Sequence, residues 1–263
     1  ERRFLKSKHA ILIPQTSDGR VLFAVPWKNY VVVGTTDTHV KKASEEPKAL
    51  NEEIDFILKN AGKYMSVKPK RDDIKSVFAG LRPLAATSNK QSTKEVSRSH
   101  KIDISPSGLI SVLGGKWTTY RKIAEDALNT AISINKLKKK KCKTERTKLF
   151  GFKRNVSWSD PMHVYGSMKK KVESLGGIND NKSLSKKFYI SNNIIEWSII
   201  HEMALTVEDI LARRTRCVFL DSKESKRISP VVAQKMADVL GEDDKWIDAE
   251  LKKFNKLIKN YIV

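Results

Sequence analysis

Residues 109–122 read LISVLGGKWTTYRK, and this stretch carries the clearest fold signal in the chain. The apolar run at 109–113 predicts a strand, and apolar residues at helical spacing after the glycine pair predict a helix to about residue 134. Gly114 and Gly115 stand between the two, because glycine adopts the backbone angles of a sharp turn without steric penalty. The stretch therefore predicts a strand–turn–helix unit.

On either side of this unit the pattern differs. Upstream, short apolar runs separated by turn residues predict strands at 9–14, 21–25, 30–34, 76–84 and 94–105, and helical spacing predicts a helix at 47–65. Downstream, residues 151–263 show helical spacing; Thr206 with Asp209 predicts a capping box, and Ser229 with Pro230 predicts a helix start. The fold class expected is α+β, a largely antiparallel sheet followed by an all-α C-terminal domain. The expected domains are 1–135, a linker at 136–150, and 151–263.

The charge balance limits the possible partners. The 263 residues carry 51 Lys and Arg against 30 Asp and Glu, a net charge of +21. Nucleic acid, an anionic membrane surface and an anionic substrate are the candidates. The segment from Lys136 to Lys148 holds eight basic residues and one acid, a net charge of +7. This pattern is typical of a solvated linker between domains. This block contains no aromatic residue to stack on bases, which weakens the nucleic-acid interpretation.

The composition also argues against a disulfide scaffold, a membrane-spanning helix and a zinc site. Two cysteines do not make a disulfide scaffold, so a reducing compartment is expected. No run of about 18 uncharged apolar residues predicts a spanning helix. No Cys and His spacing resembles a zinc site, so no metal is expected.

The glycine pair also carries the strongest candidate site. Backbone N–H groups at the start of a helix attract anions, and Lys116 adds a cation at the same turn. The alternative is a tight strand-to-helix turn with a lysine there by chance. The stretch is not a phosphate-binding P-loop, because the first glycine of that motif is missing.

Two arginines could join this lysine. Arg82 lies in AGLRPL (79–84) and Arg98 in SRSH (97–100). In an antiparallel sheet, Arg82, Arg98 and Lys116 could converge on one phosphate, which arginine binds in a bidentate manner. The alternative for each is a surface cation. His39, after GTTDT (34–38), could be a general base, although this stretch also reads as a hydrogen-bonded turn.

Taken in order, these segments resemble the C-terminal half of the FAD-dependent glycerol-3-phosphate dehydrogenases. The matching stretches are VLFAVPW (21–27), GTTDT (34–38), AGLRPL (79–84), SRSH (97–100, often SRDH in the family), PSGLI (106–110), GGKWTTYRK (114–122) and, in the helical part, HEMALTVEDILARRTR (201–216).

The resemblance implies oxidation of sn-glycerol 3-phosphate to dihydroxyacetone phosphate, with FAD taking the hydride and a membrane quinone accepting the electrons. It implies that Arg82, Arg98 and Lys116 hold the substrate. The residues it implies for the flavin site, whose backbone N–H groups would stabilise the anionic reduced ring, are Gly80, Gly114, Gly115, Lys116, Trp117, Thr118 and Thr119. A cytoplasmic protein attached peripherally to an anionic membrane is expected, a homo-oligomer is possible, and nucleic acid is not an expected partner.

One departure from the family pattern is large. The G-x-G-x-x-G turn that holds the ADP part of FAD does not occur near residue 1. The family's catalytic histidine would also lie upstream, so no catalytic residue is assigned in this chain. A fragment is therefore expected, one that alone neither binds FAD tightly nor turns over.

Two other function classes stay open. One is another flavin-dependent amine or amino-acid oxidase of the same superfamily, which would need a carboxylate site and does not predict the helical domain. The other is a basic module that binds nucleic acid or anionic lipid, which predicts salt-dependent DNA retention or liposome binding.

Overall fold

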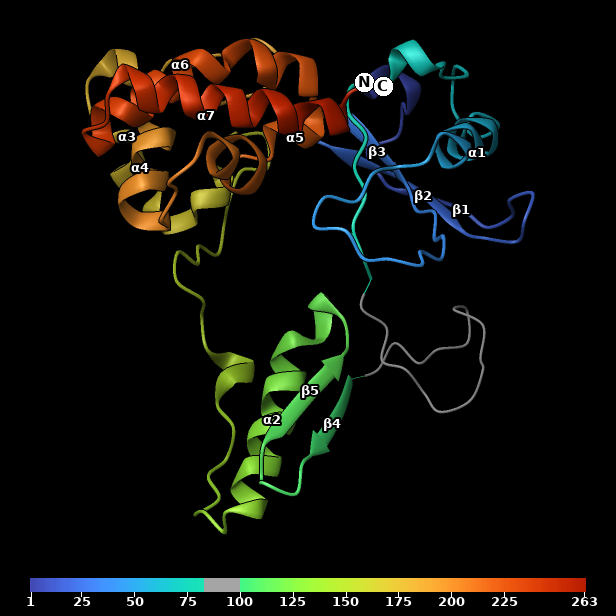
Figure 1. The fold of residues 1–263 in the computed structure, drawn as a ribbon, viewed down its shortest axis with the longest axis vertical. Coiled ribbons are helices and arrows are strands. Elements are labelled where there is room, and N and C mark those ends of the chain that lie inside the picture. Colours follow the sequence, from blue (N-terminus) through green and yellow to red (C-terminus); the bar gives the residue numbers. More distant parts are fainter. Residues whose placement is uncertain (83–99) are drawn as a thin grey trace. The chain divides into compact units, whose positions relative to one another are not determined.

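The computed structural model describes residues 1–82 and 100–263 (Figure 1). The chain divides into two compact units. Unit 1 comprises Glu1–Thr38, Ser44–Gly80 and Lys153–Val263, and unit 2 comprises His39–Ala43 and Leu81–Phe152. The α+β class with antiparallel sheets is confirmed. The domain limits expected from the sequence stay a prediction.

Unit 1 begins with a three-stranded antiparallel sheet in the order β1-β2-β3, formed by β1 (Ile11–Ile13), β2 (Leu22–Trp27) and β3 (Tyr30–Gly34). Leu12 pairs with Phe23, and Trp27 pairs with Tyr30 across a two-residue turn. The first connection contains Gly19 at φ 78°, a left-handed angle that favours glycine. Helix α1 (Asn51–Ala61) places Ala61 against the sheet residues Ile13 and Leu22. These strands and this helix confirm the elements expected there.

The helical part of unit 1 contains α3 (Lys169–Glu173), α4 (Asn192–Glu202), α5 (Cys217–Leu220), α6 (Ser222–Leu240) and α7 (Asp244–Leu257), with a π-helical turn at Asp209–Arg214. The Thr206 hydroxyl accepts the Asp209 N–H at 3.1 Å, and the Asp209 carboxylate accepts the Thr206 N–H at 3.0 Å. The predicted capping box is therefore confirmed. The short 3₁₀ turns of the described chain include Arg2–Phe4, Arg71–Asp73, Trp117–Thr119, Thr144–Arg146, His163–Met168, Ile178–Asn181 and Ile258–Tyr261.

The sheet and the helices of unit 1 share one core. Tyr30 of β3 is buried in the same cluster as Met236 of α6 and Phe254 of α7. The Val77 N–H donates to the Tyr261 carbonyl at 3.0 Å, and the Ser222 N–H donates to the Lys75 carbonyl at 3.0 Å. The two parts are thus joined by both apolar packing and backbone hydrogen bonds.

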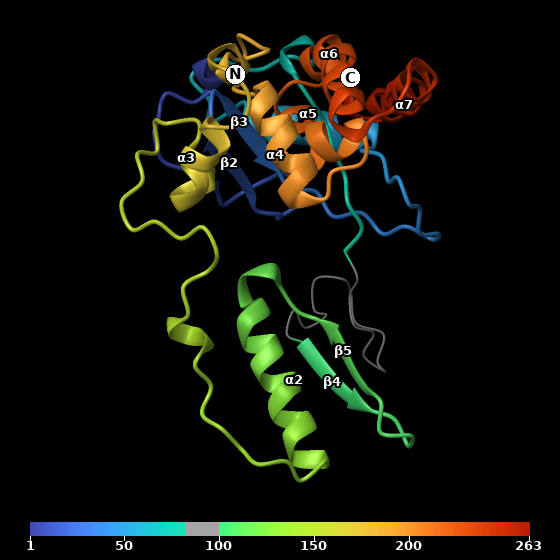
Figure 2. The same ribbon diagram turned by 90° about the vertical axis from the view of Figure 1, so that its left-hand side faces the viewer.

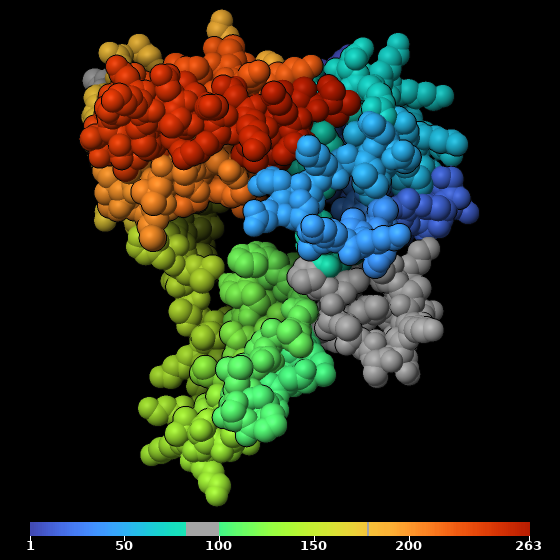
Figure 3. All heavy atoms as spheres, viewed as in Figure 1, coloured from blue at the N-terminus to red at the C-terminus, as the bar shows by residue number. Residues whose placement is uncertain are grey.

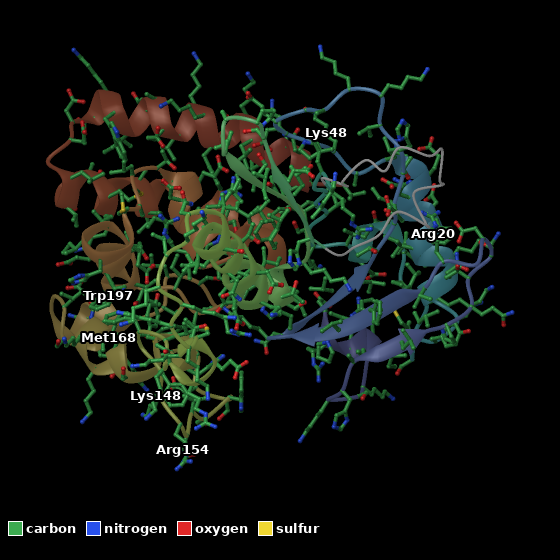
Figure 4. The ribbon with its side chains drawn as sticks, turned by 90° about the horizontal axis from the view of Figure 1, so that it is seen from below. Arg20, Lys48, Lys148, Arg154, Met168 and Trp197 are labelled. Carbon is green, nitrogen blue, oxygen red and sulfur yellow. The ribbon has the colours of Figure 1, made fainter. Side chains whose placement is uncertain are left out.

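A second, smaller core lies under α4. It consists of Met162, Val172, Ile194 and Trp197, with Met168 packed against it. Figure 4 labels Trp197 and Met168, whose side chains lie at the same end of the helical part. This cluster holds the stretch before α4 against the remaining helices.

Unit 2 is built on the predicted strand–turn–helix. Strands β4 (His100–Ile104) and β5 (Ile110–Gly114) form an antiparallel hairpin, and α2 (Tyr120–Ile134) crosses one face of it (Figure 2). None of the α2 residues is fully buried, so the helix is held by partly exposed apolar contacts.

Two sequence expectations are wrong. Residues 76–82 form no strand, and the Val77 N–H donates to the Tyr261 carbonyl of the C-terminal region instead. Ser229 and Pro230 do not begin a helix either; α6 begins at Ser222, where Asp221 accepts the Glu224 N–H at 2.9 Å. Proline is tolerated inside α6 because the Lys226 carbonyl, which loses an N–H partner, accepts the Ser229 hydroxyl at 2.9 Å.

Glu224 at the start of α6 gives a pH-dependent prediction. Hydrogen bonds from Arg227 and from the Ser185 hydroxyl lower the pKa of this buried carboxyl to about 2, against an ordinary value of 4.5. Because the folded pKa is depressed, the carboxylate stabilises the fold above about pH 4.5, and this contribution is lost as the pH falls toward 2. Glu224→Gln should lower the unfolding free energy by roughly 1–2 kcal/mol near neutral pH, since Arg227 is largely exposed.

Urea unfolding of both proteins at several pH values measures this effect. The difference between them should shrink toward pH 2–3. A constant difference across this range would contradict the assignment.

Candidate functional site

The turn between β5 and α2 is the centre of the candidate site. Gly114 and Gly115 adopt φ angles of 71° and 91°, both left-handed, so the chain reverses within two residues. The 3₁₀ turn Trp117–Thr119 follows, and the Thr119 N–H and hydroxyl each bond to the Lys116 carbonyl at 3.0 Å. The first N–H groups of such a turn lack carbonyl partners inside the helix, so they can bind an anion or a polar cofactor edge.

Two exposed side chains flank these backbone donors. Lys116 is exposed and extended at the entrance to the 3₁₀ turn. Trp117 is 85% exposed and stacks on Tyr120, with ring centroids 5.5 Å apart. The site thus presents a cation, an aromatic face and backbone donors within one short stretch.

The left-handed conformation of Gly115 yields a second prediction. A Cβ built on this residue would lie 2.5 Å from Ile123 Cδ1, and the left-handed φ disfavours any other residue. Gly115→Ala should therefore destabilise unit 2 by about 1–3 kcal/mol, through backbone strain and a forced shift of the Ile123 side chain.

Hydrogen exchange of the β4, β5 and α2 amides measures this loss. Gly108→Ala is the matched control, since it also has a left-handed φ of 86° but nothing lies within 4 Å of its Cβ position. Equal loss of protection in both variants would mean that backbone strain alone, and not the Ile123 contact, explains the effect.

The structure reveals a polar cluster that the sequence interpretation missed. His100 Nε2 lies 3.2 Å from Asp126 Oδ2, and Lys122 Nζ lies 2.7 Å from Asp126 Oδ1. The hydrogen bond from Lys122 lowers the pKa of the Asp126 carboxyl. His100 of β4 pairs with Gly114 at the end of β5, so this cluster ties α2 to β4 directly beside the glycine pair. The i,i+4 spacing of Lys122 and Asp126 was its only signal in the sequence.

The structure brings some of the predicted site residues together. Gly114, Gly115, Lys116, Trp117, Thr118 and Thr119 form one contiguous surface of unit 2. Arg82 is exposed at the end of the described stretch in the same unit, Gly80 belongs to unit 1, and Arg98 lies outside the described residues. The convergence of Arg82, Arg98 and Lys116 therefore stays a prediction.

The GTTDT stretch has a local structural role. The Thr38 hydroxyl donates to Glu53 Oε1 at 2.7 Å, and the other oxygen of this carboxylate accepts the Leu50 N–H at 3.0 Å. This bond ties the stretch to the start of α1. His39 is exposed, and its role as a general base stays a prediction.

The residues present fit a flavin at this turn. The N–H groups that follow the two left-handed glycines suit the polar edge of the ring. Among the described residues, no cluster of three His, Cys, Asp or Glu side chains could hold a metal ion.

The fold is that of an FAD-dependent oxidoreductase. Sequence models of two families match the chain: "FAD dependent oxidoreductase" over residues 3–121, and "C-terminal domain of alpha-glycerophosphate oxidase" over residues 110–247. The second match covers more than half of the chain and runs from β5 through the helical part. The chain belongs to the family of FAD-dependent glycerol-3-phosphate dehydrogenases.

Individual relatives agree with this assignment. The mitochondrial glycerol-3-phosphate dehydrogenase of Bos taurus is 33% identical over 94% of this chain, and that of Arabidopsis thaliana is 29% identical over 96%. The probable mitochondrial enzyme of Dictyostelium discoideum is 33% identical over 98%. The chain spans between 37% and 44% of the length of these relatives.

A solved structure shares the fold. The glycerol-3-phosphate dehydrogenase of Bacillus halodurans, complexed with FAD, superposes with a TM-score of 0.78 at 23% identity. The match covers all of this chain and 55% of that protein.

Proposed function

We propose that this chain forms the substrate side of an enzyme that oxidises sn-glycerol 3-phosphate to dihydroxyacetone phosphate. The observation that carries the proposal is the turn Gly114–Thr119, which combines backbone donors, the exposed Lys116 and the exposed Trp117 at the start of α2. The family assignment and the printed names of the relatives support the substrate and the reaction.

Each part of the turn has a role in this reaction. Lys116 binds the phosphate of the substrate, aided by Arg82 and Arg98, and so fixes the carbinol carbon at a set distance from the turn. The backbone N–H groups of the turn orient the polar edge of the flavin. FAD, when bound, supplies the chemistry of hydride acceptance. No catalytic acid or base is assigned to this chain.

The electron acceptor and the location are further parts of the proposal. Electrons pass to a membrane quinone, and the protein attaches peripherally to an anionic membrane from the cytoplasm. The net charge of +21 supports an anionic surface as partner. Among the described residues, no helix is long and apolar enough to cross a bilayer.

An activity comparison on the native protein that contains this chain tests the proposal. Glycerol 3-phosphate should reduce a soluble dye, whereas glycine and other amino acids should not, because three cations suit a phosphate. A soluble quinone should accept the electrons in place of the dye, and it should do so more effectively than dioxygen. Preferential oxidation of amino acids would replace the proposal with the amino-acid oxidase alternative, and hydrogen peroxide production without quinone reduction would overturn the assigned acceptor.

A further inference from the structure

One segment of unit 2 combines high positive charge with exposed aromatic residues. Residues 136–152, called the basic–aromatic segment below, begin with the block of eight basic residues and one acid. They end in Leu149, Phe150 and Phe152, which are 69%, 88% and 51% exposed. Large apolar side chains are seldom left this exposed together unless a partner covers them.

The charges of this segment are available to a partner. Among the described residues, no ion pair joins Lys138 to Lys141 with a carboxylate. The single acid of the block, Glu145, lies 3.7 Å from Arg121 of α2, so it does not neutralise the lysines. Figure 3 shows side chains of this yellow-green segment standing out from the surface.

The two halves of the segment are also connected. The Lys148 ammonium lies 5.5 Å from the centre of the Phe152 ring, so the end of the charged block lies beside the aromatic residues. At the N-terminal end of the segment, a shallow cavity of about 320 Å³ lies where α2 ends and the basic block begins. It is lined by Asn129, Ile132, Ser133, Lys136, Leu137 and Lys139, a mixture of polar, apolar and basic side chains.

This arrangement favours a lipid surface over nucleic acid. Binding to bases requires aromatic residues interleaved with the cations, so that bases stack while phosphates pair. Here the aromatic residues are not spread among the cations: Leu149, Phe150 and Phe152 form one apolar group after the lysine-rich block, and Lys153 and Arg154 follow this group. Such an order suits a bilayer, where cations meet the headgroups and aromatic side chains enter the boundary with the acyl chains.

We propose that the basic–aromatic segment binds the surface of an anionic phospholipid bilayer. Its lysines contact the headgroups, while Leu149, Phe150 and Phe152 insert into the interfacial region. This inference assigns the proposed membrane attachment to one segment, and it does not require the glycerol 3-phosphate activity.

Vesicle sedimentation of the full 263-residue chain tests the charge requirement. The probes are phosphatidylcholine vesicles with and without a share of roughly one third phosphatidylserine. Replacing Lys138, Lys139, Lys140 and Lys141 by glutamine should weaken binding to the anionic vesicles on the order of 10²-fold or more. The matched control replaces Lys223, Lys226, Lys252 and Lys256, exposed lysines of α6 and α7, and should change binding far less.

A second variant tests insertion without changing the charge. Phe150→Ser with Phe152→Ser should weaken binding to the same anionic vesicles roughly tenfold. Equal loss in the two lysine variants would overturn the assigned segment, because net charge alone would then explain binding. Equal binding to both vesicle types, or tighter retention on DNA that depends on the same lysines, would overturn the assigned partner.

The failure of this inference can be separated from that of the proposed function. In the native protein, the lysine and phenylalanine variants should oxidise glycerol 3-phosphate normally with a soluble dye as acceptor. Loss of vesicle binding with full dye-linked activity is the expected outcome. If the native protein does not oxidise glycerol 3-phosphate but the wild-type chain still binds anionic vesicles, the proposed reaction is wrong and the inference about membrane binding stands.

Discussion

Replacing Lys116 by methionine is expected to lower kcat/KM for glycerol 3-phosphate on the order of 10²-fold, because a charge-assisted hydrogen bond to the phosphate is lost. Lys116 is exposed at the mouth of the turn, where the N–H groups of the helix start already favour an anion. Methionine keeps the length and the apolar part of the side chain. The change therefore removes the positive charge with little effect on packing.

Steady-state kinetics on the native protein separates binding from chemistry. If Lys116 holds the phosphate equally in the ground state and the transition state, KM should rise and kcat should change little. Glycerol, which lacks the phosphate, should react equally slowly with both proteins. The matched control is Lys101→Met on β4, because the Lys101 side chain is 60% exposed in the same unit and pairs with Asp103 instead. An unchanged kcat/KM in Lys116→Met with FAD still bound would remove this residue from the substrate site.

Local patterns predicted the elements whose partners lie nearby in the sequence. The β1–β2–β3 meander follows from apolar runs and turn residues, and α2 follows from its spacing after the glycine pair. The strand expected at 76–84 failed over its described part because Val77 bonds to the Tyr261 carbonyl, a distant partner that no local pattern encodes. The start of α6 was misplaced because its signal, Asp221, is a buried residue far ahead of the more conspicuous Pro230.

The same limit applies to the candidate site. The residues Gly114–Thr119 were predicted together because they are contiguous. The contact of His100 with Asp126 could not be predicted, because it needs both the register that sets His100 opposite Gly114 and the placement of α2 across the hairpin. Residues that come together only in the tertiary structure have no characteristic spacing in the sequence by which they could be recognised.

Replacing Phe254 by alanine is expected to lower the unfolding free energy by about 3–5 kcal/mol, the largest stability effect foreseen for one residue here. Phe254 of α7 is 2% exposed and lies in the core that contains Tyr30 of β3 and Met236 of α6. Deleting the ring leaves a cavity inside this shared core. Urea unfolding followed by circular dichroism measures the loss.

The matched control has the same chemistry in the same chain. Phe150→Ala removes a ring that is 88% exposed, so stability should change by no more than about 0.5 kcal/mol. Because sheet and helices share a core, fluorescence of Trp27 and Trp246, both packed against it, should change together with the circular dichroism in wild type and variant. A sheet signal that survives the loss of the helices in Phe254→Ala would mean that the two parts unfold separately, and the shared core would then contribute little to their joint stability.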